Sequence, residues 1–346
     1  MRFPQLIPIA GALTAATGAG AVCAWLGTPL PWMIGPLVAL AVLQFSGTKL
    51  RAPPLGREAG QLFIAMALGL YFSPSVAREI LVHAPILAAL AIGVFLVGVG
   101  SSAFLAWAAG VDRATAYFAS AIGGASEMVT LAERNGAKPD RVAIAHSLRI
   151  LVVVTSVPVA ITLLGQTGTD DYQAIAAPFE PTTLVLHTLG AIAAGLAWRR
   201  LRLPNAFMMG PLLVTIGLAA TGAPLSTIPT WAVNAAQVLL ACNLGVRFEQ
   251  RFLREAPRFV TAALASIAVM IALAALLAVA AASLFGMIPA TALLSAAPGG
   301  IAEMAITAKV LQVGVAFVTA AHVLRFVIVM LLTEPAWRFF ARRAVR

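Results

Sequence analysis

The sequence predicts an all-α polytopic membrane protein built from two repeats of opposite orientation, and three observations lead to that prediction. Hydrophobic residues make up 61% of the 346 residues and charged residues only 10%, whereas soluble domains carry about 25% charged residues. Motifs of the first half recur in the second half in one register. The basic residues gather in alternate loops between apolar segments. The bilayer is therefore the first expected partner of the chain.

The net charge of +10 at pH 7 does not indicate a nucleic-acid partner. The Lys and Arg residues lie in short loops between apolar segments, and that distribution orients helices in a membrane. No cytoplasmic segment is long enough for a helix-turn-helix. Cys23 and Cys242 fall within apolar segments, so no disulfide framework is indicated. We interpret Arg2 and the apolar run behind it as an uncleaved first helix.

The repeat is visible when the sequence is shifted by 176 residues, which is the difference between Gly299 and Gly123. The stretch "GGASEM" then falls on "GGIAEM", and "AHSLRI" falls on "AHVLRF". We therefore expect a membrane repeat over 1–165, a periplasmic linker over 166–181 and a second membrane repeat over 182–346.

Each half offers six apolar segments, which follow in the same order along the chain. The segments of the first half are 6–26, 30–46, 57–72, 84–109, 114–134 and 141–165. Those of the second half are 182–198, 203–220, 231–247, 258–285, 290–308 and 312–333. A spanning helix needs about 20 residues. In each half the fifth segment is interrupted by a Gly-Gly pair, and its two arms are short.

Loop charges decide how the interrupted segments are interpreted. If each forms a re-entrant hairpin and the N-terminus is cytoplasmic, the basic loops 47–56, 135–140, 199–202 and 248–257 all face the cytoplasm. If the first one crossed fully, "RRLR" at 199–202 would face outward. We therefore expect five spans and one hairpin per half, about ten spans in total, with both termini in the cytoplasm. An odd number of spans gives the halves opposite orientations, which is typical of secondary transporters.

The polar residues of the repeat predict a binding site for a small molecule. Broken backbone at membrane depth is tolerated only where it is buried in protein or lines a wet cavity. A His and an Arg three residues apart share one helix face in each half. The expected site residues are Gly123, Gly124, Glu127, His146, Arg149, Gly299, Gly300, Glu303, His322 and Arg325.

Two interpretations of these charges remain open, and they are compatible. The arginine and glutamate of each half can form a structural pair that ties the hairpin to the next helix. They can also bind a substrate, with the arginine holding an anion and the glutamate holding a proton or Na⁺. Gln61 and Gln237 are candidates for the cavity lining, although a single glutamine in a span is more typical of an interhelical hydrogen bond.

The doubled motifs "PWMIGPL"/"MMGPLL", "GGASEM"/"GGIAEM" and "AHSLRI"/"AHVLRF" carry a resemblance. The chain resembles, over essentially its whole length, the bacterial AbrB family of duplicated inner-membrane proteins. It does not resemble the soluble DNA-binding regulators of the same name. The resemblance implies a location in the inner membrane and a link to the regulation of gene expression. Some members of the family carry the label ammonia monooxygenase.

The residues do not favour an enzyme. The four histidines, His83, His146, His187 and His322, show no metal-ligand spacing, so we expect no metal, cofactor or oxidase activity. The leading hypothesis is a secondary transporter of a small anionic solute, whose effect on gene expression is indirect. The alternative is a membrane sensor that binds a ligand and signals through a partner without transport. A homo-oligomer is compatible with both hypotheses.

Overall fold

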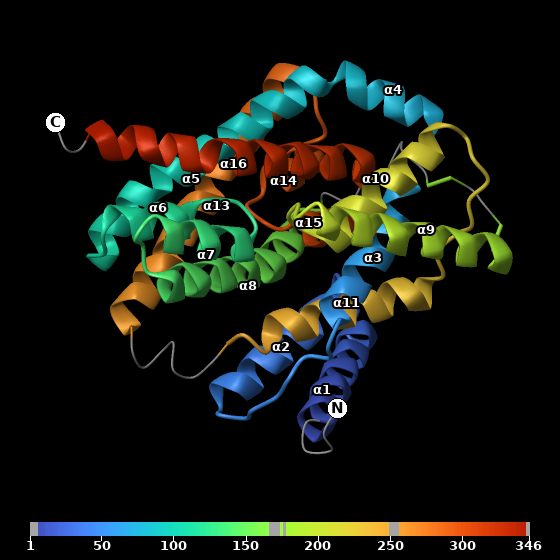
Figure 1. Cartoon of the computed structure of the whole chain (residues 1–346), viewed down its shortest axis with the longest axis horizontal. Coiled ribbons are helices and arrows are strands. Elements are labelled where there is room, and N and C mark those ends of the chain that lie inside the picture. The colour runs from blue at the N-terminus through green and yellow to red at the C-terminus, as the bar shows by residue number, and fades with distance from the viewer. Residues whose placement is uncertain (1–5, 166–173, 176–177, 249–255, 344–346) are drawn as a thin grey trace. The chain divides into compact units, whose positions relative to one another are not determined.

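The computed structural model describes residues 6–165, 174–175, 178–248 and 256–343 (Figure 1). These residues form helices and no strand, which confirms the all-α prediction. The first half contains α1 (Leu6–Trp25), α2 (Pro31–Phe45), α3 (Gly56–Gly69), α4 (Pro74–Val82), α5 (Ala84–Ala109), α6 (Arg113–Ser120), α7 (Ala125–Arg134) and α8 (Pro139–Leu163). The second half contains α9 (Pro181–Arg200), α10 (Ala206–Ala220), α11 (Thr230–Gly245), α13 (Pro257–Phe285), α14 (Pro289–Ala296), α15 (Ile301–Leu311) and α16 (Val315–Arg343).

Six of the described helices are long and apolar enough to cross a bilayer, and they are α1, α5, α8, α9, α13 and α16. The chain is therefore a multi-pass membrane protein. The helices α2 and α10 have 15 residues each. At 1.5 Å per residue each reaches about 22 Å, which is shorter than the hydrocarbon core of about 30 Å. The expected total of about ten spans thus stays a prediction.

Lipid-facing surface is recognisable on the long helices. Only 17% of the most apolar 18-residue stretch of α1 is buried within the protein, and the share in α9 is the same. The exposed positions of α9 carry large apolar side chains, including Val185, Leu186 and Leu189. Trp25 and Trp107 are exposed at the ends of α1 and α5, where tryptophan typically sits at the membrane–water interface.

One helix was not expected from the sequence. The segment α4 follows α3 after a bend of 91°, within a stretch that the sequence analysis treated as a loop. Leu81 and Val82 of α4 are exposed. The segment is too short to be seen as a span, but Pro74 at its first position is a recognised start signal for a helix.

Contacts divide the chain into two compact units that do not follow the repeat boundary. Unit 1 comprises Met1–Val82, Pro158–Gln250 and Ala305–Ala316, and unit 2 comprises His83–Val157, Arg251–Met304 and Phe317–Arg346. Each unit thus contains residues from both halves. The linker predicted over 166–181 lies mostly outside the described residues, and its periplasmic location stays a prediction.

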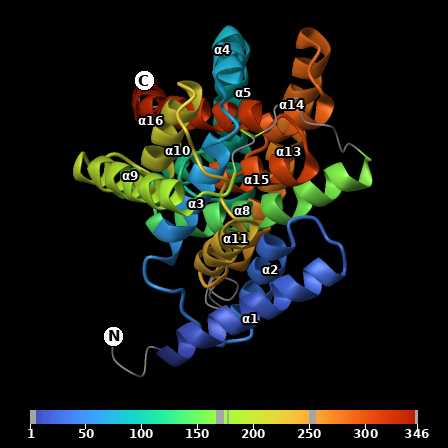
Figure 2. The same cartoon turned by 90° about the vertical axis from the view of Figure 1, so that its right-hand side faces the viewer.

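In unit 1 the first two helices of each half, α1 with α2 and α9 with α10, pack on each other in equivalent ways. The close contact between α1 and α2 can be followed in Figures 1 and 2. An added Cβ on Gly35 of α2 would lie 2.6 Å from the carbonyl oxygen of Ala19, and one on Gly210 of α10 would lie 2.7 Å from that of Ala194. The glycine of each "GPL" motif therefore permits a close helix contact.

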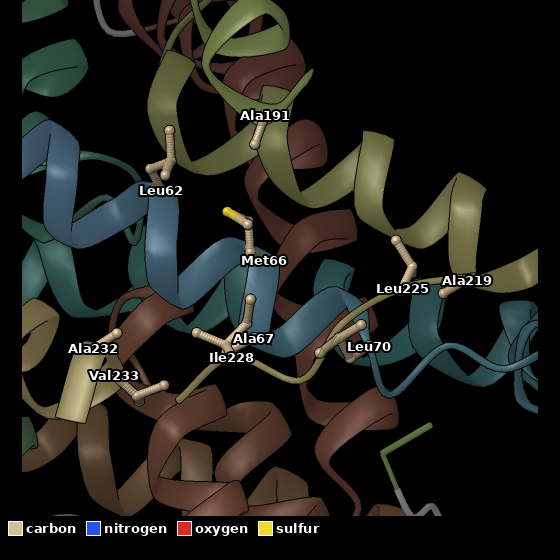
Figure 3. Close-up of a cluster of buried hydrophobic side chains, with 10 residues drawn as sticks. All are labelled: Leu62, Met66, Ala67, Leu70, Ala191, Ala219, Leu225, Ile228, Ala232 and Val233. Carbon is tan, nitrogen blue, oxygen red and sulfur yellow. The ribbon is translucent and has the colours of Figure 1, made fainter. Parts of the chain in front are cut away.

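The core of unit 1 joins the two halves around α3. Figure 3 shows the side chains of this cluster, in which α3 contributes Leu62, Met66 and Ala67, and Leu70 directly follows α3. The second half contributes Ala191, Ala219, Leu225, Ile228, Ala232 and Val233. Burial of these apolar side chains away from water stabilises the packing of unit 1.

Unit 2 is also built from both halves. Its apolar cluster includes Val94 of α5, Met270 and Ala278 of α13, and Ala292 of α14. Ile122, which directly precedes the first Gly-Gly pair, belongs to the same cluster. In addition, the hydroxyl of Tyr117 in α6 donates to the carbonyl oxygen of Thr333 in α16 at 2.9 Å. The broken segments are therefore fixed within a packed core.

Candidate functional site

Each Gly-Gly segment is a break between two short helices, and both breaks lie in unit 2. The helix α6 ends at Ser120 and α7 begins at Ala125, while α14 ends at Ala296 and α15 begins at Ile301. Ala121 and Gly124 are extended, with φ of −60° and −68°. The predicted interruptions are thus confirmed as breaks in the helix. Whether each pair of arms is re-entrant stays a prediction.

The break glycines are needed for space rather than for an unusual backbone angle. None of the four has a φ in the left-handed region. A Cβ on Gly124 would collide with the carboxylate of Glu127, and one on Gly300 would collide with that of Glu303. A Cβ on Gly123 would lie 2.8 Å from Cε of Met128. The motif G-G-x-x-E-M therefore describes a glutamate and a methionine that fold back over two glycines.

The same packing occurs in the second half. A Cβ on Gly299 would lie 2.7 Å from Cγ of Met304. In both halves the glutamate is the third residue of its short helix and turns toward the residue that precedes the helix. This is the placement of the glutamate in a capping box.

Arg149 and His146 of α8 hold the carbonyl groups that the first break releases. Arg149 donates from Nη1 to Ala121 O at 2.7 Å and from Nη2 to Gly123 O at 3.1 Å. Nε2 of His146 lies 3.0 Å from Phe118 O. These carbonyls have lost their helical partners, and unsatisfied backbone groups are costly at membrane depth. A cation at the C-terminal end of α6 also complements the helix dipole.

His322 and Arg325 of α16 repeat these bonds in the second half. Arg325 donates from Nη1 to Ala297 O at 2.7 Å and from Nη2 to Gly299 O at 2.5 Å. Nε2 of His322 lies 2.8 Å from Leu294 O. Each acceptor lies 176 residues after its counterpart, so the repeat found in the sequence extends to the hydrogen bonds.

Each arginine keeps a nitrogen donor that has no partner among the residues that the structure describes. Arg149 and Arg325 are both only 4% exposed, and their Nε atoms make no hydrogen bond within the described part of the chain. The histidines are fully buried, and their Nδ1 atoms likewise lack a partner there. Because a carbonyl oxygen only accepts, Nε2 of each histidine carries the proton and Nδ1 is a bare acceptor.

Electrostatic contacts bring the two halves together at this place. The guanidinium groups of Arg149 and Arg325 lie close enough to repel each other, and both are attracted by the carboxylate of Glu303. Glu303 belongs to the second half, so its contact with Arg149 crosses between the repeats. The described residues thus bring two buried cations and one carboxylate into one electrostatic cluster within unit 2.

The expected pairing of Arg149 with Glu127 is not what the structure shows. Arg149 uses Nη1 and Nη2 on backbone carbonyls. Among the described residues no ion pair joins it to Glu127, and its electrostatic partner is Glu303. The physical reason is that a broken helix presents carbonyl acceptors directly to a guanidinium, and those acceptors are already desolvated.

The two glutamines belong to unit 1. Nε2 of Gln61 donates to Oδ1 of Asn205 at 2.8 Å, which is the interhelical hydrogen bond that sequence reasoning favoured for it. Gln237 is 4% exposed, and its Oε1 has no partner within the described residues. Their placement on a cavity wall stays a prediction.

Sequence reasoning did not identify the carbonyl acceptors, since a backbone group leaves no mark on the sequence. Each donor lies 26 or 28 residues after its acceptor, and the recurrence of this spacing in both halves was the available signal. Within the described residues no group of three or more His, Cys, Asp or Glu side chains could hold a metal ion.

The chain is similar to a known protein family and to individual proteins of two bacteria. The family described as "Transition state regulatory protein AbrB" matches residues 32–341. "Uncharacterized protein YhjN" of Bacillus subtilis (strain 168) is 28% identical over 345 residues, covering 92% of this chain and 89% of that protein. "Putative regulator AbrB" of Escherichia coli (strain K12) is 28% identical over 315 residues, covering 89% of both chains.

Proposed function

We propose that this chain, which belongs to the AbrB family of membrane proteins, is a secondary transporter of a small anionic solute across the bacterial inner membrane. The observation that carries the proposal is the pair of buried arginines, one from each half, that share the carboxylate of Glu303. Two cations and one carboxylate leave a net charge of +1, which favours an anionic ligand.

Energetics favour a functional role for this excess charge. An arginine at the centre of a span costs roughly 2.5–3.5 kcal/mol on insertion scales. Carbonyl bonds compensate part of that cost, but one guanidinium could be replaced by a neutral donor if capping were its only role. The guanidinium group is planar and carries five N–H donors, so it can bind backbone carbonyls and an anion at the same time. Its Nη bonds to the break fix its orientation, and Nε remains as a donor for a ligand.

The expected inverted arrangement supports transport over simple binding. Secondary transporters place their sites where broken helices of two inverted repeats meet near the middle of the membrane. The equivalent hydrogen bonds of the two halves and the alternation of basic loops agree with that design. In this proposal the protein binds and moves its ligand without a chemical step, and both termini lie in the cytoplasm.

A second candidate function is a ligand sensor that signals through a partner protein. The observation that favours it is the name of the E. coli relative, which describes that protein as a regulator. The sensor would use the same arginines. The two functions differ in turnover, because only a transporter exchanges its ligand across a sealed membrane.

A two-stage experiment tests the proposal. Purified protein is heated with acetate, lactate, succinate or inorganic phosphate, and a ligand at 100 times its dissociation constant should add about 2.7 kcal/mol to the unfolding free energy. Arg149→Lys should lose this stabilisation, because lysine keeps the charge but lacks the planar group that binds the break through Nη and keeps Nε for a ligand. Proteoliposomes loaded with the stabilising anion should then exchange it for labelled anion outside.

Three results would count against the transporter. If none of the four anions stabilised the protein, the anion site would be contradicted. An unchanged response to the anions in Arg149→Lys would also contradict it. Stabilisation without exchange would favour the sensor. The matched control is Arg338→Lys, which changes an exposed arginine of α16 that pairs with Glu334.

A further inference from the structure

The two glutamates of the repeat, which the sequence presents as equivalent, have different surroundings. Glu303 interacts electrostatically with both Arg149 and Arg325. Glu127 folds over Gly124 as Glu303 folds over Gly300. Within the described residues, however, Glu127 makes no ion pair and is not an electrostatic partner of either arginine. The carboxylate of Glu303 therefore interacts electrostatically with the two arginines, and the carboxylate of Glu127 does not.

We infer that Glu303 is a tethered carboxylate that holds the place of the substrate at Arg149 and Arg325, so that the substrate is a monocarboxylate and enters when Glu303 takes up a proton. This inference rests on the proposed function and names the substrate class and coupling ion of the same site. Its first support is chemical, since the group that the protein itself presents to both guanidinium groups is a carboxylate.

The geometry of the second break supports the same inference. Nη2 of Arg325 is bound to the carbonyl oxygen of Gly299, and the Glu303 carboxylate lies over the adjacent Gly300. Glu303 is only half-buried while both arginines are buried. The unpartnered Nε atoms of the two arginines are donors that a second carboxylate could use. The flexible side chain of Glu303 can move away from the arginines, whereas the arginines are held by their hydrogen bonds to backbone carbonyls.

Charge balance gives the stoichiometry. With Glu303 ionised and no substrate, the cluster carries two positive charges and one negative charge. With Glu303 protonated and one monovalent anion bound, it again carries two positive charges and one negative charge. Exchange of the tethered carboxylate for a monocarboxylate therefore leaves the buried charge unchanged if one proton enters with it. A second buried negative charge without that proton would repel Glu303 at short range.

Other titratable groups around the site are accounted for. His146 of α8 and His322 of α16 each present Nε2 to a backbone carbonyl and are fully buried. A second proton on either ring would place an extra cation beside an arginine. Glu127 of α7 faces Gly124, and Lys309 lies six residues beyond Glu303 on α15. Glu303 is the only carboxylate that interacts electrostatically with both arginines in the described part of unit 2.

The test measures proton uptake on anion binding to the purified full-length protein. Nitrate is the probe, because it is planar and monovalent like a carboxylate and keeps its charge at every pH used. Binding in a weakly buffered solution should take up one proton per nitrate, reported by a pH indicator. The apparent affinity should fall about tenfold per pH unit once Glu303 is ionised in the free protein. Acetate should displace nitrate.

Variants identify the group that takes the proton. Glu303→Gln should bind nitrate more tightly than the wild type at neutral pH, with no proton uptake and no dependence on pH. Glu133→Gln, which changes an exposed carboxylate on α7, is the matched control and should behave as the wild type. Proton uptake that persists in Glu303→Gln, or that disappears in Glu127→Gln instead, overturns the inference. Failure of acetate to displace nitrate overturns the substrate class.

Failure of this inference differs from failure of the proposed function. If nitrate binds, and Arg149→Lys weakens it, but no proton is taken up, the anion site stands and the role of Glu303 is wrong. If neither nitrate nor acetate binds at any pH, the proposed function is wrong and the inference falls with it. Should Glu303→Gln not fold, the proton count of the wild type decides, because a value of zero overturns the inference.

Discussion

At the scale of single residues, the two buried arginines of unit 2 donate hydrogen bonds to the backbone. Arg149 and Arg325 each satisfy two carbonyl groups at a break, and the histidine one turn earlier lies against a third. This explains why the His and Arg recur together with the Gly-Gly pair. An arginine that is immobilised in this way presents its remaining donor without a further loss of conformational entropy.

The structural role of Arg149 leads to a prediction about a double substitution. Arg149→Leu should lower the unfolding free energy by about 2–6 kcal/mol, since two buried carbonyl groups lose their donor at about 1–3 kcal/mol each. Adding Glu127→Leu should not restore stability, because Glu127 is not the partner of Arg149. Thermal unfolding in detergent measures both variants.

The control for this prediction is Arg338→Leu. Arg338 is an exposed arginine that pairs with Glu334 at 2.7 Å, and exposed pairs contribute about 0–1 kcal/mol. Recovery of stability in the variant that carries both Arg149→Leu and Glu127→Leu would show that the two side chains pair in the membrane, contrary to the structure.

At the scale of helices, some features could be predicted from local sequence patterns, whereas others depend on contacts between residues far apart in the chain. The apolar segments and the interruption at Gly-Gly were predictable, because hydrophobicity and the "GGASEM" and "GGIAEM" motifs are local. The acceptors of Arg149 were not, because they are backbone groups 26 and 28 residues away. The electrostatic interaction of Arg149 with Glu303 rather than Glu127 also depends on how unit 2 folds. Sequence reasoning therefore singled out the residues that lie at the breaks but exchanged one partner, and their role as a binding site stays a prediction.

The contact between α3 and α10 supplies a prediction at this scale. Gln61 and Asn205 form a hydrogen bond between the two halves. The residue that corresponds to Asn205 in the first half, with one residue of slippage, is Leu30, and both have left-handed backbone, with φ of 54° and 48°. Gln237, the counterpart of Gln61, has an unpartnered Oε1 within the described residues. A polar pair is thus formed on one side only.

A double-mutant cycle measures that pair. Gln61→Leu and Asn205→Leu should each destabilise unit 1, and their effects should be coupled by about 0.6 kcal/mol, with about 1.7 kcal/mol as the upper bound for such bonds in membranes. The same cycle on Gln237→Leu and Leu30→Ala should show no polar coupling. Equal coupling in both cycles would contradict the difference between the halves.

At the scale of the whole molecule, the boundary between the two sequence repeats does not coincide with the boundaries of the two compact units. Each compact unit contains helices of both halves, so neither repeat is an independent domain. In unit 1, α3 of the first half packs on α10 and α11 of the second. In unit 2, α5 packs on α13. Such interleaving is what a duplicated chain needs in order to bring its two Gly-Gly breaks into a single core.

The orientation of the halves leads to the last prediction, which concerns topology. Single cysteines are introduced at positions 28, 75 and 170, and at 52, 138 and 200, after replacement of Cys23 and Cys242. Asp170 lies outside the described residues, but chemical labelling does not depend on its placement. The first three should react with an impermeant thiol reagent applied to the periplasmic side of intact cells. The other three should react only after the membrane is opened, because basic loops remain in the cytoplasm. A permeant reagent labels all six and serves as the control for accessibility.

Position 200 is decisive, since the "RRLR" loop is exposed at the end of α9. Labelling of position 200 from outside would mean that the first Gly-Gly segment crosses the membrane, and the arrangement of two inverted halves would then be wrong.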